Sequence, residues 1–321
     1  MKHFTYAAVI MIWLLSAISV SAGNVTHPAN KTTQGSRFYK NQFQSRLFLI
    51  AVIDSDDKDI GKRCETDLDE VTYAFEELAD WLGMEMEGPK IIKGDQFSKA
   101  AVTDAINNWL QTQAPSRTDI VVFYYSGHGF RYPTDASEYP RMWLKTQEDQ
   151  NVETTNLRMK EDIYDRIIKM GAGVNIVLSD CCNTTVAGDN ANFDNVMVTA
   201  RERVAHKRQQ QGSENSDDDL DNGDKLFIRD HPLSILATAA DKGELAGGKD
   251  DFGGFFTGYF LEALSKCVYD GDIQPAWENI LHYADEKAGY WARSAACPKA
   301  KHNAQGRCIQ TAKFRIDNNG R

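Results

Sequence analysis

The sequence predicts an α/β protein, a three-layer α/β/α sandwich around a mostly parallel six-stranded sheet. Unbroken apolar runs such as residues 47–53 and 120–125 are typical of strands that are covered on both faces. Segments with helical periodicity alternate with these runs, as expected for right-handed crossovers between parallel strands. Of the 321 residues, 42% are hydrophobic, which is enough to bury such a core.

The first strand is predicted at residues 47–53 (LFLIAVI), and it ends in a run of polar residues that begins at Asp54. Residues 66–82 repeat apolar side chains at helical spacing, and Gly83 is a typical residue for the end of a helix. Ile91 and Ile92 indicate a short second strand. The chain therefore opens with a strand, a helix and a strand.

Ser98 is a good N-cap for a second helix, which is predicted to continue to residue 110. Residues 120–125 (IVVFYY) form the third strand, and a long loop with tyrosine and proline follows. An amphipathic helix over residues 161–170 then leads into a fourth strand at 174–178.

After Cys182 no regular pattern is evident, and residues 186–228 are predicted to be a disordered or processing loop inside the domain. Order returns with a fifth strand at 233–237. The last predicted elements are two helices and a strand, at 255–264, 277–290 and 309–316.

The N-terminus carries the pattern of a secretory signal peptide. A basic start is followed by an apolar run and then by small residues that end at Ala22, so residues 1–22 are predicted to be removed on export. Residues 23–45 are polar and are predicted to be a flexible leader, and residues 46–321 form one domain. We therefore expect a secreted or periplasmic protein.

Charge limits the classes of partner. Lys and Arg number 36 against 46 Asp and Glu, so the formal net charge is −10, which argues against nucleic acid as a partner. After the signal peptide no stretch is long and apolar enough to span a membrane.

Two neighbouring predicted strands end in residues that can carry chemistry. One runs into the segment Ser126–Gly129, and the other runs into the segment Ser179–Asn183. Because functional groups of parallel sheets gather at the carboxyl ends of strands, His128 is expected to face a cysteine and activate it as a nucleophile. Backbone N–H groups of Gly129 and Cys182 would then bind the oxyanion.

These segments, YYSGHG and SDCCN, resemble the motifs of caspase-like cysteine peptidases, and they are more similar to the metacaspase and bacterial branch than to animal caspases. The resemblance covers residues 46–316 in element order and implies that Cys182, rather than Cys181, is the nucleophile. His128 precedes Cys182 by 54 residues, and caspases place the histidine about 50 residues upstream. No third catalytic residue is evident.

The same resemblance implies an acidic substrate pocket. Asp180 precedes the nucleophile by two residues, and Asp241 corresponds to an acidic pocket residue of the metacaspase pattern. Two carboxylates would favour Arg or Lys in the substrate and repel Asp. The alternative for Asp241 is a role as a strand-end cap.

The predicted loop contains a basic cluster at which such an enzyme could cleave itself: Arg201, Arg203, Lys207 and Arg208. A solvated charged loop is the competing interpretation. The acidic residues that follow, between 214 and 224, do not match the spacing of a calcium-binding loop and are expected to be solvated.

Cys297 and Cys308 are expected to form a disulfide in an exported protein, with a Cys/His metal site as the weaker alternative. Cys64 and Cys267 are either buried thiols or a second disulfide. No cofactor is required by the sequence. Calcium is a candidate activator by resemblance, with Asp189 as a possible ligand, although only part of that acidic pattern is present.

The sequence thus predicts a secreted cysteine endopeptidase that acts on protein or peptide substrates, cleaves after Arg or Lys and uses a Cys182–His128 dyad. One rival is a catalytically silent protein of the same fold that binds partners, supported by the unusual sequel Asn183–Thr184. The other is a peptidase that cleaves after Asn or Asp.

Overall fold

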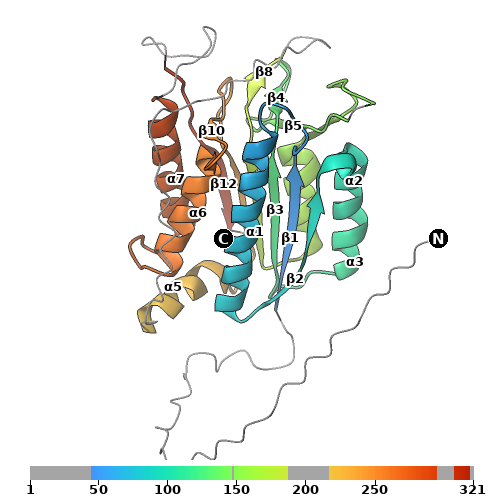
Figure 1. Cartoon of the computed structure of the whole chain (residues 1–321). Coiled ribbons are helices and arrows are strands. Elements are labelled where there is room, and N and C mark those ends of the chain that lie inside the picture. Colours follow the sequence, from blue (N-terminus) through green and yellow to red (C-terminus); the bar gives the residue numbers. More distant parts are fainter. Residues whose placement is uncertain (1–44, 147, 187–216, 295–306, 319–321) are drawn as a thin grey trace, which may run out of the picture. The chain divides into compact units, whose positions relative to one another are not determined.

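A computed structural model describes residues 45–146, 148–186, 217–294 and 307–318 (Figure 1). The predicted signal peptide and almost all of the predicted leader lie outside the described residues. So do Asp189, Cys297 and the four basic residues of the predicted cleavage segment.

One six-stranded sheet forms the centre of the fold. Its strands are β1 (Arg46–Ile53), β2 (Glu85–Ile92), β3 (Ile120–Ser126), β7 (Val174–Asp180), β9 (Leu233–Thr238) and β12 (Lys313–Asn318). The order is β12-β9-β7-β3-β1-β2, and every neighbouring pair is parallel except β12 with β9. The predicted fold class is confirmed.

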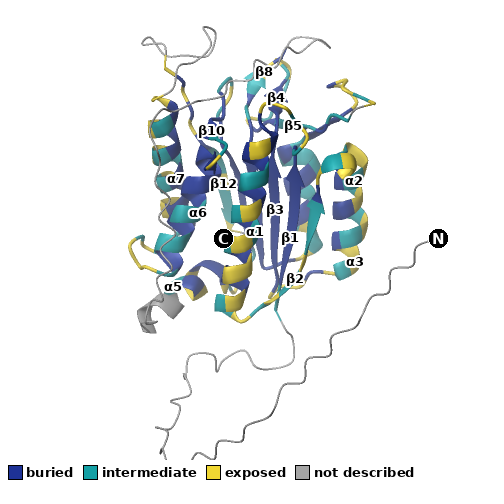
Figure 2. Ribbon diagram, viewed as in Figure 1, coloured by how far each residue is buried: buried dark blue, intermediate teal, exposed yellow. Residues whose placement is uncertain are grey.

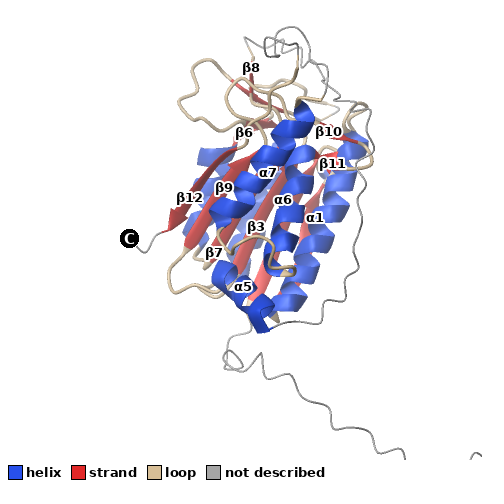
Figure 3. Ribbon diagram, turned by 90° about the vertical axis from the view of Figure 1, so that its left-hand side faces the viewer, coloured by secondary structure: helices blue, strands red, loops and turns tan. Residues whose placement is uncertain are grey.

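Helices cover both faces of this sheet (Figures 1 and 3). One face packs against α1 (Gly61–Leu82), α5 (Asp217–Phe227), α6 (Phe255–Val268) and α7 (Trp277–Ala292). The other face packs against a continuous helical segment, α2 (Lys99–Asp104), η2 (Ala105–Leu110) and α3 (Gln111–Gln113), and against a second one, η3 (Met159–Tyr164), α4 (Asp165–Ile167) and η4 (Ile168–Met170).

Alternation along the strands separates the two cores. In β1, Leu47 and Leu49 face the α1 side, whereas Phe48 and Ile50 face the α2 side. All four side chains are fully buried, because helices cover both faces. Figure 2 shows the consequence, since the central strands of the sheet are buried while the outward sides of the helices are exposed.

Local signals explain where several elements begin and end. Gly83 adopts a left-handed conformation (φ 66°) and closes α1, as predicted. Ser98 accepts a hydrogen bond from the N–H of Ala101 at 3.2 Å and caps α2. The α1 helix begins at Gly61, earlier than the predicted residue 66. The N–H of Gly61 donates to the carbonyl oxygen of Asp57 at 2.9 Å, which places this start directly after the loop that follows β1.

A second, smaller sheet lies beyond the carboxyl ends of β3 and β7, where the sequence predicted only a loop. It consists of β4 (Gly129–Arg131), β5 (Arg141–Trp143), β6 (Asn156–Arg158) and β8 (Thr184–Thr185), in the order β6-β5-β4-β8. A two-stranded hairpin, β10 (Gly248–Lys249) with β11 (Gly253–Gly254), precedes α6. Together with the short turn η1 (Gly94–Gln96), these are the remaining elements of the described chain.

Two predicted boundaries are wrong. The segment 186–228 is not one continuous loop, because Val186 is buried and residues 217–227 form α5, whose end packs Phe227 edge-on against Trp277 at 5.2 Å between ring centroids. The last strand is Lys313–Asn318 rather than residues 309–316.

None of the helices in the described ranges is both long and apolar enough to cross a membrane.

Candidate active site

Three neighbouring strands deliver their carboxyl ends to the same place. Ser126 at the end of β3 is in register with Ile53 of β1 on one side and with Asp180 of β7 on the other. His128 and Cys182 each follow this register level by two residues. The structure therefore brings the two predicted catalytic residues to one edge of the sheet, as the spacing of the motifs indicated.

Gly129 allows the His128 segment to pack directly on the Cys182 segment. A Cβ atom at Gly129 would lie 2.2 Å from the carbonyl oxygen of Cys182 and 2.5 Å from Sγ of Cys181. Only glycine fits at this distance. Immediately beyond, Phe130 of β4 pairs with Thr184 of β8, which holds the two segments side by side.

The two adjacent cysteines have different environments. Cys181 is buried, and burial raises the pKa of its thiol. Cys182 is not in a disulfide and is of intermediate burial, and the N–H of Ala246 donates to its Sγ at 3.4 Å. A backbone donor to sulfur favours a thiolate. These environments agree with the choice of Cys182 as nucleophile, which stays a prediction, as do the oxyanion roles of Gly129 and Cys182.

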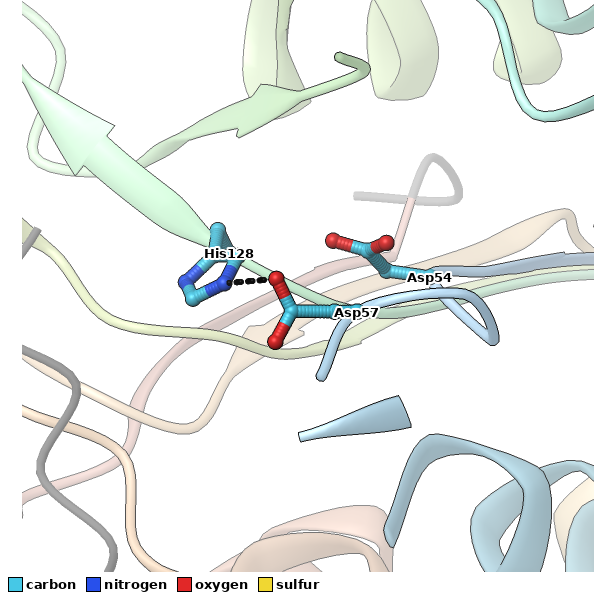
Figure 4. A group of neighbouring side chains, drawn as sticks. All are labelled: Asp54, Asp57 and His128. Carbon is cyan, nitrogen blue, oxygen red and sulfur yellow. Dashed lines mark hydrogen bonds and ion pairs between the residues drawn. The ribbon is translucent and has the colours of Figure 1, made fainter. Parts of the chain in front are cut away.

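His128 makes a hydrogen bond that the sequence did not predict. Its Nε2 lies 3.0 Å from Oδ2 of Asp57, in the loop between β1 and α1 (Figure 4). The other oxygen of Asp57 accepts from the backbone N–H groups of Asp59 and Ile60. The carboxylate is thus fixed through one oxygen and turned toward the imidazole with the other.

Asp57 is ionised in this arrangement. Burial alone would raise its pKa, but the hydrogen bonds from His128 and Lys145 outweigh that effect and hold the pKa well below its usual range. Lys145 forms an ion pair with Asp57 through Oδ2 and lies 3.8 Å from Oδ2 of Asp54. The ammonium group therefore stands between the two carboxylates.

Asp54 differs from Asp57. It is 3% exposed, and burial raises its pKa to about 6, although Lys145 and His128 act in the opposite direction. The backbone N–H of Asp54 donates to the carbonyl oxygen of Ser126 at 2.9 Å, which joins the ends of β1 and β3. Asp54 is thus a buried acid beside the histidine, titrating near neutral pH.

Aromatic residues fix the position of the histidine backbone. The Tyr125 hydroxyl donates to the carbonyl oxygen of His128 at 2.6 Å, and the N–H of Trp143 donates to the same oxygen at 3.0 Å. The Trp143 ring packs against the imidazole with 5.7 Å between centroids. His128 is therefore held by main-chain and side-chain contacts on more than one side.

Asp54, Asp57 and His128 could also be considered as metal ligands, since their ligand atoms lie within 4.8 Å of one another. The positively charged ammonium of Lys145 already pairs with both carboxylates. A divalent ion would have to displace this ammonium group. The three residues therefore do not fit a metal ion while Lys145 is paired with the carboxylates, and we assign no metal site here.

Two buried acids, Asp67 and Asp180, form what we call the acidic pair. Asp180 accepts from the N–H and the hydroxyl of Thr257, in the first turn of α6, each at 3.0 Å. Asp67 accepts from the Ser126 hydroxyl at 2.6 Å and from the N–H of Gly254 at 2.7 Å. Both side chains are 1% exposed.

The two acids perturb one another. Burial, followed by the charge of Asp180, raises the pKa of Asp67 to about 7, against the opposing effect of its hydrogen bonds. Burial also raises the pKa of Asp180. The predicted pocket residue Asp180 thus has a carboxylate neighbour, but that neighbour is Asp67 on α1, which the sequence analysis did not single out.

Asp241, the other predicted pocket residue, lies elsewhere. It is half-exposed in the loop after β9, where it accepts from the N–H of Lys242, and this loop is joined to Asn183 by main-chain hydrogen bonds. Among the described residues Asp241 makes no hydrogen bond or ion pair with Asp180. It lies beside the nucleophile segment, and a pocket role stays a prediction.

The cysteines divide into two groups. Cys308 is disulfide-bonded, and its expected partner Cys297 lies outside the described residues. Cys64 and Cys267 are buried free thiols, which settles the alternative that the sequence left open.

Comparison with known proteins gives one family. The family model described as caspase domain matches residues 57–282. A search of curated proteins found no match. Among solved structures, a Geobacter sulfurreducens protein is 15% identical with a TM-score of 0.44, covering 87% of this chain and 95% of that one. Caspase-1 from Spodoptera frugiperda is 11% identical with a TM-score of 0.44, covering 85% and 87%.

Proposed function

Because this chain belongs to the caspase domain family of cysteine peptidases, we propose that it is a secreted or periplasmic cysteine endopeptidase with Cys182 as its nucleophile. The observation that carries the proposal is the meeting of Cys182, His128 and Asp57 at one edge of the sheet. These residue types form a nucleophile, a base and an orienting carboxylate.

The contacts assign a role to each group. His128 takes the proton of the Cys182 thiol, the resulting thiolate attacks the carbonyl carbon of the scissile bond, and the N–H groups of Gly129 and Cys182 stabilise the oxyanion. His128 protonates the leaving amine, which leaves a thioester on Cys182. His128 then takes a proton from water as the water hydrolyses the thioester. Asp57 keeps the imidazole in one orientation and stabilises its protonated form.

Loss of peptidase activity in both Cys182→Ala and His128→Ala tests this assignment. The variants are compared with the wild type on a mixture of peptide substrates, with circular dichroism to confirm that each is folded. Full activity in either variant would refute the dyad.

The acidic pair supports a preference for substrates with Arg or Lys before the scissile bond. Asp180 directly precedes the two cysteines, and Asp67 adds a second carboxylate to the same place. Buried carboxylates favour a cation and disfavour another anion. Hydrolysis of matched peptides ending in Arg, Lys, Asn and Asp measures this directly, and preference for Asp or Asn would support the rival peptidase.

A catalytically silent protein is the rival from another class, based on the unusual sequel to the nucleophile. The structure gives Asn183 a packing role, because its side-chain amide donates to the carbonyl oxygens of Glu138 and Ala240. That role explains the asparagine in structural terms, so its presence does not by itself favour a silent protein. Labelling of Cys182 by a thiol-reactive peptide that ends in Arg separates the two functions, since a silent protein would not be labelled selectively.

Self-cleavage within the basic segment at residues 201–208 is part of the same proposal, since an enzyme that prefers basic residues would accept it. Mass spectrometry of the wild type beside Cys182→Ala measures it. A cut in the wild type alone supports self-processing, and the same cut in both proteins excludes it. Adding and chelating calcium in the same assay tests its role as an activator.

A further inference from the structure

A buried arginine stands beside the acidic pair. Arg63 lies in the first turn of α1 and is 7% exposed. Its charge interacts with those of Asp180, Asp67 and Cys182. In return, the positive charge of Arg63 opposes the rise in the pKa of both acids that burial causes. A guanidinium group of the chain itself thus accompanies the carboxylates that are proposed to recognise a basic substrate.

The β10–β11 hairpin closes over this group, and three of its glycines make room for it. A Cβ at Gly248 would lie 2.4 Å from Cδ of Arg63, and one at Gly253 would lie 2.1 Å from Oδ1 of Asp67. A Cβ at Gly254 would lie 2.0 Å from Oδ2 of Asp180. One glycine therefore stands against each of the three charged side chains.

Arg63 is near the acidic pair without being locked to it. Among the described residues the guanidinium forms no hydrogen bond and no ion pair within 4.0 Å, and its Nε is buried without a partner. The Oδ1 atom of Asp180 is also buried without a partner. A structural arginine–carboxylate pair is normally bidentate and satisfies both groups, and unsatisfied buried charges cost stability. This arrangement is therefore suited to exchange of one cation for another.

We propose that Arg63 stands in for the basic side chain of the substrate and is displaced when that side chain binds. The inference rests on the proposed function, and it adds a residue that sets how strongly a basic side chain is recognised. The substrate cation must compete with a cation of the chain itself, so removal of Arg63 strengthens recognition of Arg and Lys while the acidic pair still excludes Asp.

The first experiment measures kcat/KM of Arg63→Ala on matched peptides that end in Arg and in Asp. Lys62→Ala is the control, because Lys62 is the neighbouring cation on α1 and its side chain is 77% exposed. We expect a rise of about tenfold on the Arg peptide for Arg63→Ala alone. An unchanged or lower value on the Arg peptide would overturn the inference. A preference for the Asp peptide in the wild type that disappears in Arg63→Ala would also overturn it, because Arg63 would then bind the substrate's carboxylate.

A second experiment does not depend on turnover. In a Cys182→Ala background, agmatine, a small guanidinium compound, is added to the protein with and without Arg63→Ala, and the Tm is followed. Agmatine is expected to raise the Tm more in the protein without Arg63 than in the protein that keeps it, because in the latter it must displace Arg63. Equal shifts in both proteins, or none in either, would contradict the inference. If Arg63→Ala does not fold, Arg63→Met keeps most of the side-chain volume without the charge and is used in both experiments. If no peptide is hydrolysed but agmatine shifts the Tm as expected, the proposed function is refuted and the inference about Arg63 is not.

Discussion

In the proposed mechanism, the hydrogen bond between Asp57 Oδ2 and His128 Nε2 determines which imidazole nitrogen exchanges a proton with Cys182. Because Nε2 faces the carboxylate, we expect Nδ1 to be the nitrogen that serves the thiol. Lys145 adds an ion pair to the same carboxylate. The charge near the histidine is therefore set by residues that are far apart in sequence and meet at the ends of β1, β3 and β5.

Asp57→Asn is expected to lower kcat by one to three orders of magnitude while KM changes little, because the protonated imidazole loses its counter-charge. Asp56→Asn is the matched control, since Asp56 is the exposed neighbour in the same loop. The kinetics of both variants and their pH profiles are measured together. Equal activity in Asp57→Asn and wild type would show that the carboxylate has no part in catalysis.

The acidic pair predicts a pH dependence that is specific for basic substrates. The pKa of Asp67 is raised to about 7, so a proton is bound as the pH falls through that value and the pair becomes less negative. For an Arg peptide, kcat/KM should fall below pH 7, mainly through a higher KM. The ratio of kcat/KM on the Arg peptide to kcat/KM on a neutral peptide cancels the effect of pH on the catalytic groups, which both peptides share. A ratio that does not change between pH 5.5 and 8.5 contradicts this role.

Sequence identified His128 and Cys182, because each stands in a short motif at the end of an apolar strand. Asp57 lies in the acidic run that follows β1. The end of that strand indicated a functional position, but four polar residues stand there and the sequence gave no reason to choose Asp57 among them. Asp67 and Arg63 carry no local signal, since they lie on a helix whose periodicity only indicates a buried face. Their proposed roles arise from tertiary contacts with the β10–β11 hairpin.

At the scale of elements, prediction succeeded where the side-chain pattern is long. Strands β1, β3 and β7 are apolar on both faces and were recognised from that property. The strands of the small sheet have two or three residues each, which is too short for any periodicity. The α5 helix begins in an acidic run without apolar periodicity, and tertiary packing of Leu226 and Phe227 accounts for its end.

The β10–β11 hairpin is predicted to tolerate no side chain at Gly254. The backbone conformation itself (φ −68°) suits alanine, so the penalty comes from a contact of 2.0 Å with the Asp180 carboxylate. Gly254→Ala should lower the free energy of unfolding by about 2–3 kcal/mol and reduce activity. Gly88→Ala in β2 is the control, because nothing lies within 4 Å of the added atom. Equal stability of the two variants in chemical denaturation would show that the hairpin is not packed on Asp180.

At the scale of the whole molecule, ionisable groups are concentrated at one edge of the sheet, where burial raises the pKa of Asp54, Asp67 and Asp180. Most of the rest of the sheet between the helical layers is apolar, apart from buried polar residues such as Asn175 in β7 and Ser234 in β9. The proposed active site thus lies where the fold has the least favourable charge burial, as expected for an active site. This concentration of ionisable groups depends on the order of the strands in the sheet, which the sequence motifs alone do not predict.

Asp54 should make global stability depend on pH. Its pKa is raised from 3.8 to about 6 in the folded protein, so the folded state binds a proton more tightly than the unfolded state does. The free energy of unfolding should therefore decrease as the pH rises from 4 to 6, by about 3 kcal/mol from this group. Asp54→Asn lacks this decrease. Denaturation of both proteins at several pH values measures the difference, and parallel pH profiles would contradict the raised pKa.

Covalent labelling of Cys182 tests the central claim most directly. The wild type is treated with a thiol-reactive peptide that ends in Arg, beside Cys182→Ala and His128→Ala, and the labelled residue is located by mass spectrometry. We expect labelling at Cys182 in the wild type, none at that position in Cys182→Ala, and much slower labelling in His128→Ala. No selective reaction at Cys182, or an equal rate in His128→Ala, would contradict a peptidase built on these two residues.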